Sequence, residues 1–277
     1  MRRLCRDGQW VLMANGLYAT RQPDWMSHLW AGVLLGGDSA VVGGWAAAHL
    51  HGFAEAPSVI DIWSEGAART GLRLAGPPEV VLHEGVRRGR GSPAITSAAR
   101  TILDSVAGLS DDDVVGLVTR ARRVSPGLQG RLRSELAAVS KVSHRALLTE
   151  LVQPVNRGVE SPLEWRFVRD VVKAHGLPKI TLQVSHRRGT RSDASFDEFP
   201  LLVELDGFTW HGDRRDADQW RDNELLITSG RRTLRYGFRQ IAGRPCEVAH
   251  QLARALSVLG WRGPLKRCTR CRRVHRY

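Results

Sequence analysis

Residues 201–223 of the chain read LLVELDGFTWHGDRRDADQWRDN, and this stretch decides the fold of the second half of the protein. Its first six residues alternate in character: the odd-numbered positions are all apolar, and Glu204 and Asp206 occupy two of the even-numbered positions. In a β-strand this alternation sends both carboxylates to one face and an apolar row to the other. Because two acidic side chains on one face repel each other, the pattern predicts positive charge beside them.

A short loop upstream supplies a third carboxylate. If residues 197–200 form a four-residue hairpin loop, Asp193 lies opposite Glu204 on the same face, within about 5.5 Å. Together with Asp206 these residues form an oxygen-ligand cluster on an open edge, which is how proteins hold Mg²⁺. In the alternative without a metal, Arg191 or Arg235 neutralises the strand carboxylates.

A histidine and several arginines follow the cluster directly. His211 is a candidate proton acceptor, and Arg214, Arg215 and Arg221 are candidates for binding phosphate oxygens. Plainer alternatives stay open, since a single histidine after a strand is often structural. Arg221 would also pair with Asp218 if both lie on one helix face.

Five short motifs in a fixed order carry a resemblance to a known family. They are SPLE at 161–164, RSDASF at 191–196, ELDG with His211 at 204–211, RDN at 221–223 and LRY at 234–236. With these motifs, the run from about residue 160 to 241 resembles the very-short-patch-repair (Vsr)-like branch of the PD-(D/E)xK endonuclease superfamily. The resemblance implies a restriction-endonuclease-like mixed sheet flanked by helices. It also implies a Mg²⁺-dependent endodeoxyribonuclease, in which Mn²⁺ can substitute.

The resemblance assigns metal ligands. Asp193, Glu204 and the backbone carbonyl of Leu205 would hold one or two Mg²⁺ ions, with Glu164 as a further ligand from the start of a helix. Glu164 has a second interpretation, because Ser161-Pro162-Leu163-Glu164 is also a helix capping box with proline at the first helical position. The two roles are compatible with each other.

Catalytic roles follow from the same resemblance, with one departure. The wider superfamily has a lysine two residues after the glutamate, and this chain has Asp206 there, as its branch does. His211 or Asp206 would accept the proton of a metal-bound water, and Arg221 would offset charge on the phosphate. Arg235 joins the candidate DNA-binding arginines.

The distribution of charge points to a polyanionic partner. The 277 residues are 42% hydrophobic and carry a formal net charge of +13. Residues 1–155 have 17 basic and 14 acidic side chains (+3), whereas residues 156–277 have 24 and 14 (+10). A cationic half around an acidic centre suits a polyphosphate substrate.

The first half of the chain resembles a second family. GLYAT at 16–20, SAVVGGWAAAHLHGF at 39–53, VIDIW at 59–63 and GSPAITSAARTILD at 91–104 are similar to the AbiEi-like antitoxins of type IV toxin–antitoxin systems, over roughly residues 9–120. That family has a winged helix-turn-helix, and this chain begins at the wing. The resemblance implies an α+β domain with a truncated winged helix-turn-helix.

Elements in the first half are expected from periodicity, caps and turn residues. Two short strands should meet at Ala14-Asn15-Gly16, followed by two helices between Asp24 and Phe53, the second beginning at Asp38 or Ser39. The other expected elements are strands at 59–63, 72–74 and 80–83 and helices at 98–107, 111–122, 128–139 and 143–152.

The predicted domain organisation has five parts. They are a residual wing at 1–20, an antitoxin-like domain at 21–152, a linker at 153–160, a nuclease-like domain at 161–260 and a basic, cysteine-containing tail at 261–277. In the nuclease-like domain we expect strands at 180–186, 190–197, 201–206 and 231–236 and helices from Ser161 to Gly176, at 214–229 and at 245–259.

The four cysteines are scattered and do not form a disulfide framework. Cys268, Cys271 and His275 offer three of the four ligands of a closed Zn²⁺ site, with Cys246 as the local candidate for the fourth. The alternative is a mobile cationic arm that contacts the phosphate backbone. No apolar run approaches the roughly 18 residues of a membrane helix, and no signal-peptide core is present, so we expect a cytoplasmic protein.

The sequence therefore predicts a metal-dependent DNA endonuclease in a bacterial DNA-repair or phage-defence setting, with DNA and a cognate toxin or repair proteins as partners. The rival hypothesis is a non-catalytic DNA-binding antitoxin or transcriptional repressor of a type IV toxin–antitoxin system. The intact acidic residues favour the endonuclease, and the absent recognition helix argues against operator binding.

Overall fold

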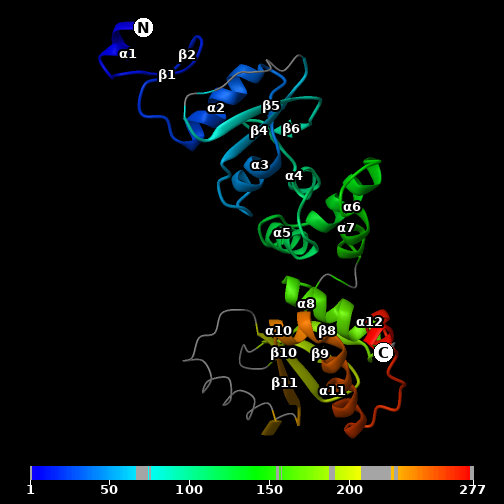
Figure 1. Cartoon of the computed structure of the whole chain (residues 1–277). Coiled ribbons are helices and arrows are strands. Elements are labelled where there is room, and N and C mark those ends of the chain that lie inside the picture. The colour runs from blue at the N-terminus through cyan, green and yellow to red at the C-terminus, as the bar shows by residue number, and fades with distance from the viewer. Residues whose placement is uncertain are drawn as a thin grey trace. The chain divides into compact units, whose positions relative to one another are not determined.

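The computed structural model describes residues 2–66, 74, 76–153, 156, 158–186, 191–206, 226–227 and 230–274 (Figure 1). The chain divides into two compact units, unit 1 from Met1 to Gln153 and unit 2 from Pro154 to Tyr277. The boundary falls inside the predicted linker at 153–160. Each unit combines a mixed β-sheet with helices, so the chain belongs to the predicted α/β class.

Unit 1 begins with a short helix and a hairpin. Helix α1 (Arg2–Arg6) precedes strands β1 (Val11–Ala14) and β2 (Leu17–Ala19), which pair antiparallel. Gly16 has a φ of 80°, the left-handed conformation that so tight a turn favours. The predicted hairpin is confirmed, but residues 2–6 are helical and do not extend its first strand.

A five-stranded mixed sheet forms the centre of unit 1, with the order β5-β4-β3-β7-β6. Its strands are β3 (Val41–Val42), β4 (Val59–Ser64), β5 (Glu79–Glu84), β6 (Gly89–Arg90) and β7 (Ile95–Thr96). Pairs β4/β5 and β3/β7 are parallel, and pairs β3/β4 and β6/β7 are antiparallel. The strands predicted at 59–63 and 80–83 are confirmed, whereas most of the one at 72–74 lies outside the described residues.

Two helices pack on this sheet, α2 (Trp25–Gly36) and α3 (Gly44–Leu50). A buried cluster joins Leu29 of α2 and Ala47 of α3 to Ile62 of β4. At Gly32 the helix lies so close to the sheet that an added Cβ atom would be 2.5 Å from Ile62 Cδ1. The close packing of α2 on β4 therefore requires glycine at position 32, because glycine has no Cβ atom.

The predicted start of the second helix at Asp38 or Ser39 is wrong. Val41 and Val42 are fully extended and pair with β4, and Val42 also pairs with β7, before the helix begins at Gly44. Two β-branched residues between two strands gain more from this pairing than from a helical turn.

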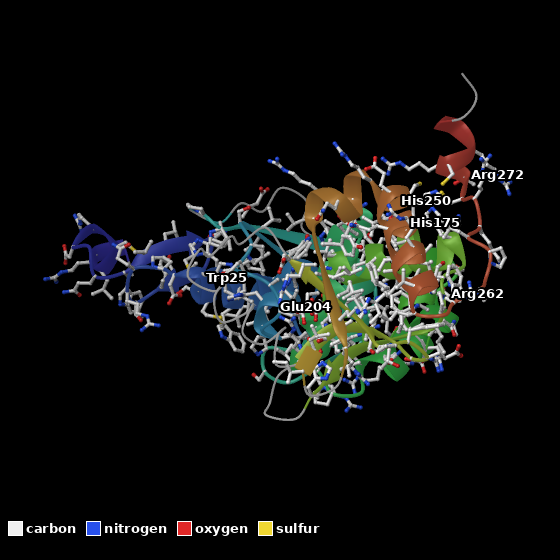
Figure 2. The ribbon with its side chains drawn as sticks, turned by 90° about the horizontal axis from the view of Figure 1, so that it is seen from below. Trp25, His175, Glu204, His250, Arg262 and Arg272 are labelled. Carbon is white, nitrogen blue, oxygen red and sulfur yellow. The ribbon has the colours of Figure 1, made fainter. Side chains whose placement is uncertain are left out.

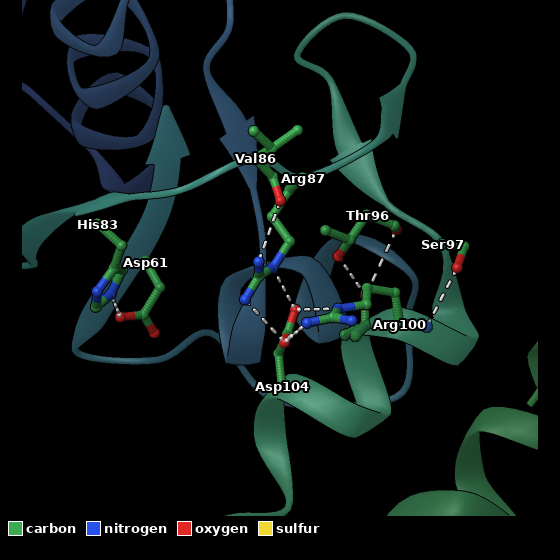
Figure 3. A network of polar contacts seen from close by, with 9 residues as sticks. Asp61, His83, Val86, Arg87, Thr96, Ser97, Arg100 and Asp104 are labelled. Atoms are coloured by element: carbon green, nitrogen blue, oxygen red, sulfur yellow. Dashed lines mark hydrogen bonds and ion pairs between the residues drawn. The ribbon is translucent and has the colours of Figure 1, made fainter. Parts of the chain in front are cut away.

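Four helices complete unit 1: α4 (Ala98–Ser105), α5 (Asp111–Val124), α6 (Leu128–Ala138) and α7 (Arg145–Leu151). They correspond to the four predicted helices. Ser97 caps α4 by accepting the N–H of Arg100 at 3.1 Å. The predicted pair of Arg100 and Asp104 is present at 2.9 Å, and Arg87 binds the same carboxylate at 3.2 Å (Figure 3).

Unit 2 is built on a four-stranded sheet with the order β11-β10-β9-β8. Its strands are β8 (Ile180–Ser185), β9 (Arg191–Phe196), β10 (Leu201–Asp206) and β11 (Arg232–Gly237). Strands β8, β9 and β10 are antiparallel neighbours, and β10 is parallel to β11. Leu202 pairs with Ser195 and Val203 with Ala194, which is the register that the four-residue loop predicted.

Helices cover the apolar face of this sheet. They are α8 (Pro162–Arg166), continued by the π-helical segment η2 (Phe167–Lys173), then α10 (Phe238–Gly243) and α11 (Pro245–Val258). The last helix is α12 (Thr269–Val274). One core cluster joins Val203 of β10 to Phe167 of η2 and Leu252 of α11. Strand alternation therefore leaves the acidic residues of β9 and β10 on the other face.

The C-terminal segment lies against the helices of unit 2. The backbone N–H of Lys266 donates to the carbonyl of His175 at 2.9 Å, and the Arg270 guanidinium donates to the carbonyl of Gly243 at 2.5 Å. Trp261 and Leu265 pack at the edge of the core. Residues 261–274 are thus docked, in contrast to the predicted mobile arm. Within the described part of the chain, no helix is both long and apolar enough to span a membrane.

Candidate functional site

A polar row crosses three strands of unit 2. The register of β9 and β10 continues from Val203 and Ala194 to place Glu204 opposite Asp193, as predicted. On the other side of β9, Leu182 pairs with Ala194 and Val184 with Ser192, so Gln183 lies opposite Asp193. Cross-strand neighbours share a sheet face, and this places Gln183, Asp193 and Glu204 side by side.

Asp193 is held at the centre of the row. Its Oδ2 atom accepts the backbone N–H of Leu205 at 2.7 Å, and its carboxylate also accepts a hydrogen bond from the Gln183 side chain. Burial raises the pKa of Asp193, and the charge of Asp206 adds to the effect. The backbone of Leu205 thus borders the site through its N–H, while its carbonyl as a metal ligand remains a prediction.

Glu164 serves as a helix cap and also borders the row. Its Oε1 atom accepts the Ser161 hydroxyl at 2.8 Å, and its Oε2 atom accepts the backbone N–H of Glu160 at 2.9 Å. The side chain of Gln183 hydrogen-bonds to it as well. Burial raises the pKa of Glu164, and the nearby charge of Asp193 contributes. Capping therefore accounts for the buried position of this carboxylate but leaves it beside Asp193.

Gln183 is the residue of this site that sequence reasoning missed. It has a φ of 55°, a left-handed conformation that non-glycine residues rarely adopt. Its amide binds both Glu164 and Asp193, and its Oε1 atom is buried without a hydrogen-bond partner among the described residues. The polar interruption of the strand ITLQVS, aligned with Asp193 by the hairpin register, was the available signal.

Both arginines considered as charge partners lie near the row. The guanidinium of Arg191 binds Glu160 at 2.8 Å, and its positive charge also acts to lower the pKa of Asp193. Arg235, a predicted DNA-binding residue, is the register partner of Glu204 on β11. Glu204 is 8% exposed, and Arg235 on the neighbouring strand therefore supplies positive charge next to a buried carboxylate.

Several predicted site residues lie outside the described residues. They are His211, Arg214, Arg215, Arg221 and His275. The predicted helix at 214–229 falls largely in the same part of the chain. The roles predicted for these five residues stay predictions.

A second group of side chains meets at the other end of the first helix of unit 2. His175, Cys246, Cys268 and Cys271 place one ligand atom each within 4.8 Å of one another. Among the described residues this is the one group of at least three His, Cys, Asp or Glu side chains arranged to hold a metal ion. Three of its members were predicted, but the histidine that the structure brings to the cysteines is His175.

The raised pKa of Asp193 leads to a test by thermal unfolding. Because the folded protein disfavours the charged carboxylate, stability falls as the pH rises from the unfolded-state pKa through the higher folded-state pKa. We expect Asp193→Asn to raise the midpoint of the metal-free protein at pH 7, measured by calorimetry. Adding Mn²⁺ should stabilise the wild type and not the variant.

Glu198→Gln is the matched control, because it removes one charge from an exposed loop position beside the same strands. It should leave both the midpoint and the Mn²⁺ response unchanged. A lower midpoint for Asp193→Asn would mean that the carboxylate is satisfied by its hydrogen bonds.

Comparisons of the chain with family models, with curated proteins and with solved structures found no match. The roles of these residues therefore rest on the sequence motifs and on the arrangement described above.

Proposed function

We propose that unit 2 is a metal-dependent DNA endonuclease. The observation that carries the proposal is the row formed by Gln183, Asp193 and Glu204, with Glu164 beside it. Burial and neighbouring carboxylates raise the pKa values of Glu164 and Asp193, and groups perturbed in this way are candidates for a functional site. A bound cation would compensate the negative charge of such a site.

The donors in the row suit Mg²⁺. Mg²⁺ prefers a few carboxylates together with waters and substrate phosphates, and the carboxylates here come from two strands and one helix. The buried Oε1 atom of Gln183 adds a neutral oxygen in need of a partner. In this proposal Asp193 and Glu204 would hold the ion, and waters, substrate phosphates or Glu164 would complete its coordination, because the three carboxylates are not gathered as tightly as the His/Cys group. Mg²⁺ bound there would polarise a phosphodiester and lower the pKa of a bound water.

In this proposal the side chains around the row position a metal ligand, accept a proton or bind phosphate. Asp193 is kept in place by the N–H of Leu205 and by Gln183, so its orientation does not depend on substrate. Asp206 is exposed at the end of β10, where it or His211 accepts a proton from the attacking water. Arg221 binds a phosphate through its planar guanidinium.

The topology supports a finer assignment of unit 2 to the restriction-endonuclease-like fold of the Vsr-like branch. A helix precedes three antiparallel strands, and a parallel fourth strand pairs with β10, whose carboxylates form the site. Unit 1 is assigned in the same proposal to the AbiEi-like antitoxin family. The hairpin of β1 and β2 would be the wing of that family's winged helix-turn-helix.

The direct test is a plasmid nicking assay. Supercoiled DNA incubated with the full chain and Mg²⁺ should be converted to the open circular form, with Mn²⁺ as a substitute. Ca²⁺ and a chelator should each prevent conversion, since Ca²⁺ takes the same ligands with looser geometry. Failure to cut supercoiled, mismatched or single-stranded DNA with either Mg²⁺ or Mn²⁺ would contradict the proposal.

Salt dependence gives a further prediction about binding. The residues from 156 onward carry a net charge of +10, so most contacts should be with phosphates. In a plot of the logarithm of the binding constant against the logarithm of salt concentration, each neutralised phosphate adds about −0.9 to the slope. With Ca²⁺ in place of Mg²⁺, fluorescence anisotropy on duplexes of unrelated sequence should give similar, steep slopes. Salt-insensitive binding to one sequence would favour the regulator.

A further inference from the structure

Four potential metal ligands converge from three separate parts of unit 2. His175 follows η2, Cys246 lies in the first turn of α11, and Cys268 and Cys271 flank the start of α12. All four are buried or half-buried. Figure 2 shows His175 near α11 and the C-terminal segment. The group is separate from the carboxylate row in both position and chemistry.

The spacing of the ligand atoms matches a tetrahedral metal site. Zn²⁺ binds sulfur at about 2.3 Å and histidine nitrogen at about 2.0–2.1 Å, so neighbouring ligand atoms in a tetrahedron lie about 3.5–3.8 Å apart. The Sγ atom of Cys268 is 3.6 Å from those of Cys246 and Cys271, and Cys271 Sγ is 3.5 Å from His175 Nε2. A disulfide would need about 2.05 Å.

Hydrogen bonds orient two of the ligands for metal binding. His175 Nδ1 lies 3.0 Å from the carbonyl of Val171, which can only accept, so Nδ1 carries the proton and Nε2 keeps its lone pair toward the cysteines. The backbone N–H of Cys271 donates to Cys268 Sγ at 3.4 Å. A bond to sulfur of this kind favours the thiolate, which is the form that binds metals.

We propose that His175, Cys246, Cys268 and Cys271 bind one Zn²⁺ ion in a closed structural site that fastens residues 261–274 to the helices of unit 2. Three thiolates and one imidazole are a common structural zinc ligand set. The set excludes Mg²⁺ and Ca²⁺, which take oxygen ligands. With all four positions filled by protein, no position is open for a substrate.

The contacts of the C-terminal segment explain why it needs such a site. Apart from Trp261, Leu265 and the two cysteines, the side chains from 261 to 272 are exposed, so little apolar surface holds the segment. It nevertheless passes close to the first helix, because an added Cβ at Gly176 would be 2.8 Å from Lys266 Cδ. The metal would supply the stabilisation that apolar burial does not.

Metal content of the purified full chain is the first test. Protein made in zinc-supplemented medium and purified without chelators should contain about one zinc per chain by inductively coupled plasma mass spectrometry. Cys268→Ser and Cys271→Ser should each lose most of it. Cys5→Ser and His250→Gln are matched controls that should keep it, since Cys5 lies in unit 1 and His250 is an exposed neighbour of His175 outside the ligand set (Figure 2).

Two measurements on the wild type keep the test independent of variant folding. Co²⁺ exchanged into the protein should give the intense visible bands of tetrahedral thiolate coordination. Trypsin should cleave within the segment at Arg267, Arg270 or Arg272 only after the metal is removed. The proposal would be overturned if the purified protein contained no zinc and the thiols of Cys246, Cys268 and Cys271 reacted as fast as in the unfolded chain. A disulfide among these three cysteines would also overturn it. Neither result bears on DNA cleavage.

Discussion

Glu204→Ala is expected to lower Mg²⁺-dependent cleavage by about a thousandfold or more, while DNA binding stays the same or tightens. The side chain is a proposed metal ligand, and the metal's electrostatic contribution to such a reaction is several kcal/mol, each 1.36 kcal/mol being tenfold in rate. Its removal also deletes a negative charge that would repel phosphate. Single-turnover nicking and anisotropy on the same duplex would measure both quantities.

Two controls separate the loss of a ligand from other effects. Glu204 is buried, so alanine leaves a cavity, and Glu204→Gln keeps the volume while weakening metal binding. Both variants should be inactive if the carboxylate binds the metal. Glu198→Ala makes the same change of charge at an exposed loop position and should cleave normally. Normal cleavage by Glu204→Gln would contradict the role of Glu204 as a metal ligand required for cleavage.

His211→Ala is expected to lower turnover by roughly a hundredfold, because a positioned general base contributes about that much or more. The neutral form of histidine is required, so wild-type turnover at saturating Mg²⁺ should rise with pH through the histidine pKa, about 6.5 if unperturbed. The variant should lose this limb of the pH profile. His250→Ala should change neither the rate nor the profile.

Cation affinity also depends on pH, and this dependence must be separated from the pH dependence of turnover. The raised pKa values of Asp193 and Glu164 mean that protons compete with the cation on the acidic side, so affinity should increase as the pH rises through those values. Ca²⁺ binding followed by calorimetry reports this effect alone and should be the same in His211→Ala. A variant that keeps both its rate and its pH limb would assign the proton to Asp206 or to solvent.

Local signals predicted much of the fold. The four-residue loop fixed the register of β9 and β10, and the Ser97 cap located the start of α4. The two-residue strands β3, β6 and β7 were not predicted. Strands β3 and β7 depend on each other although they are distant in sequence, and β6 pairs only with the nearby β7 through two residues. A pair of valines says little about structure until the neighbouring strands are known.

The candidate sites show the same limit. Asp193 and Glu204 are joined by a hairpin, so their pairing could be derived from the chain alone. Gln183 joins them only through the pairing of β8 with β9, and the hairpin of β9 and β10 does not determine that register. His175 is far from the cysteines in sequence. The packing of η2 against α11 brings it near Cys246, and Cys271 of α12 lies 3.5 Å from its Nε2 atom. His275, the predicted ligand, is the histidine closer to Cys271 in sequence.

The position of the apolar contacts along the chain affects the order in which the protein can fold during synthesis. Unit 1 completes its buried clusters with residues that precede Gln153, so it can fold while the later residues are still being translated. The core of unit 2 includes Leu256, Trp261 and Leu265, and its sheet is covered by α11. The four β-strands therefore leave the ribosome before α11, the helix that covers their apolar face, has been synthesised. In that interval their apolar faces are open to chaperones and to aggregation.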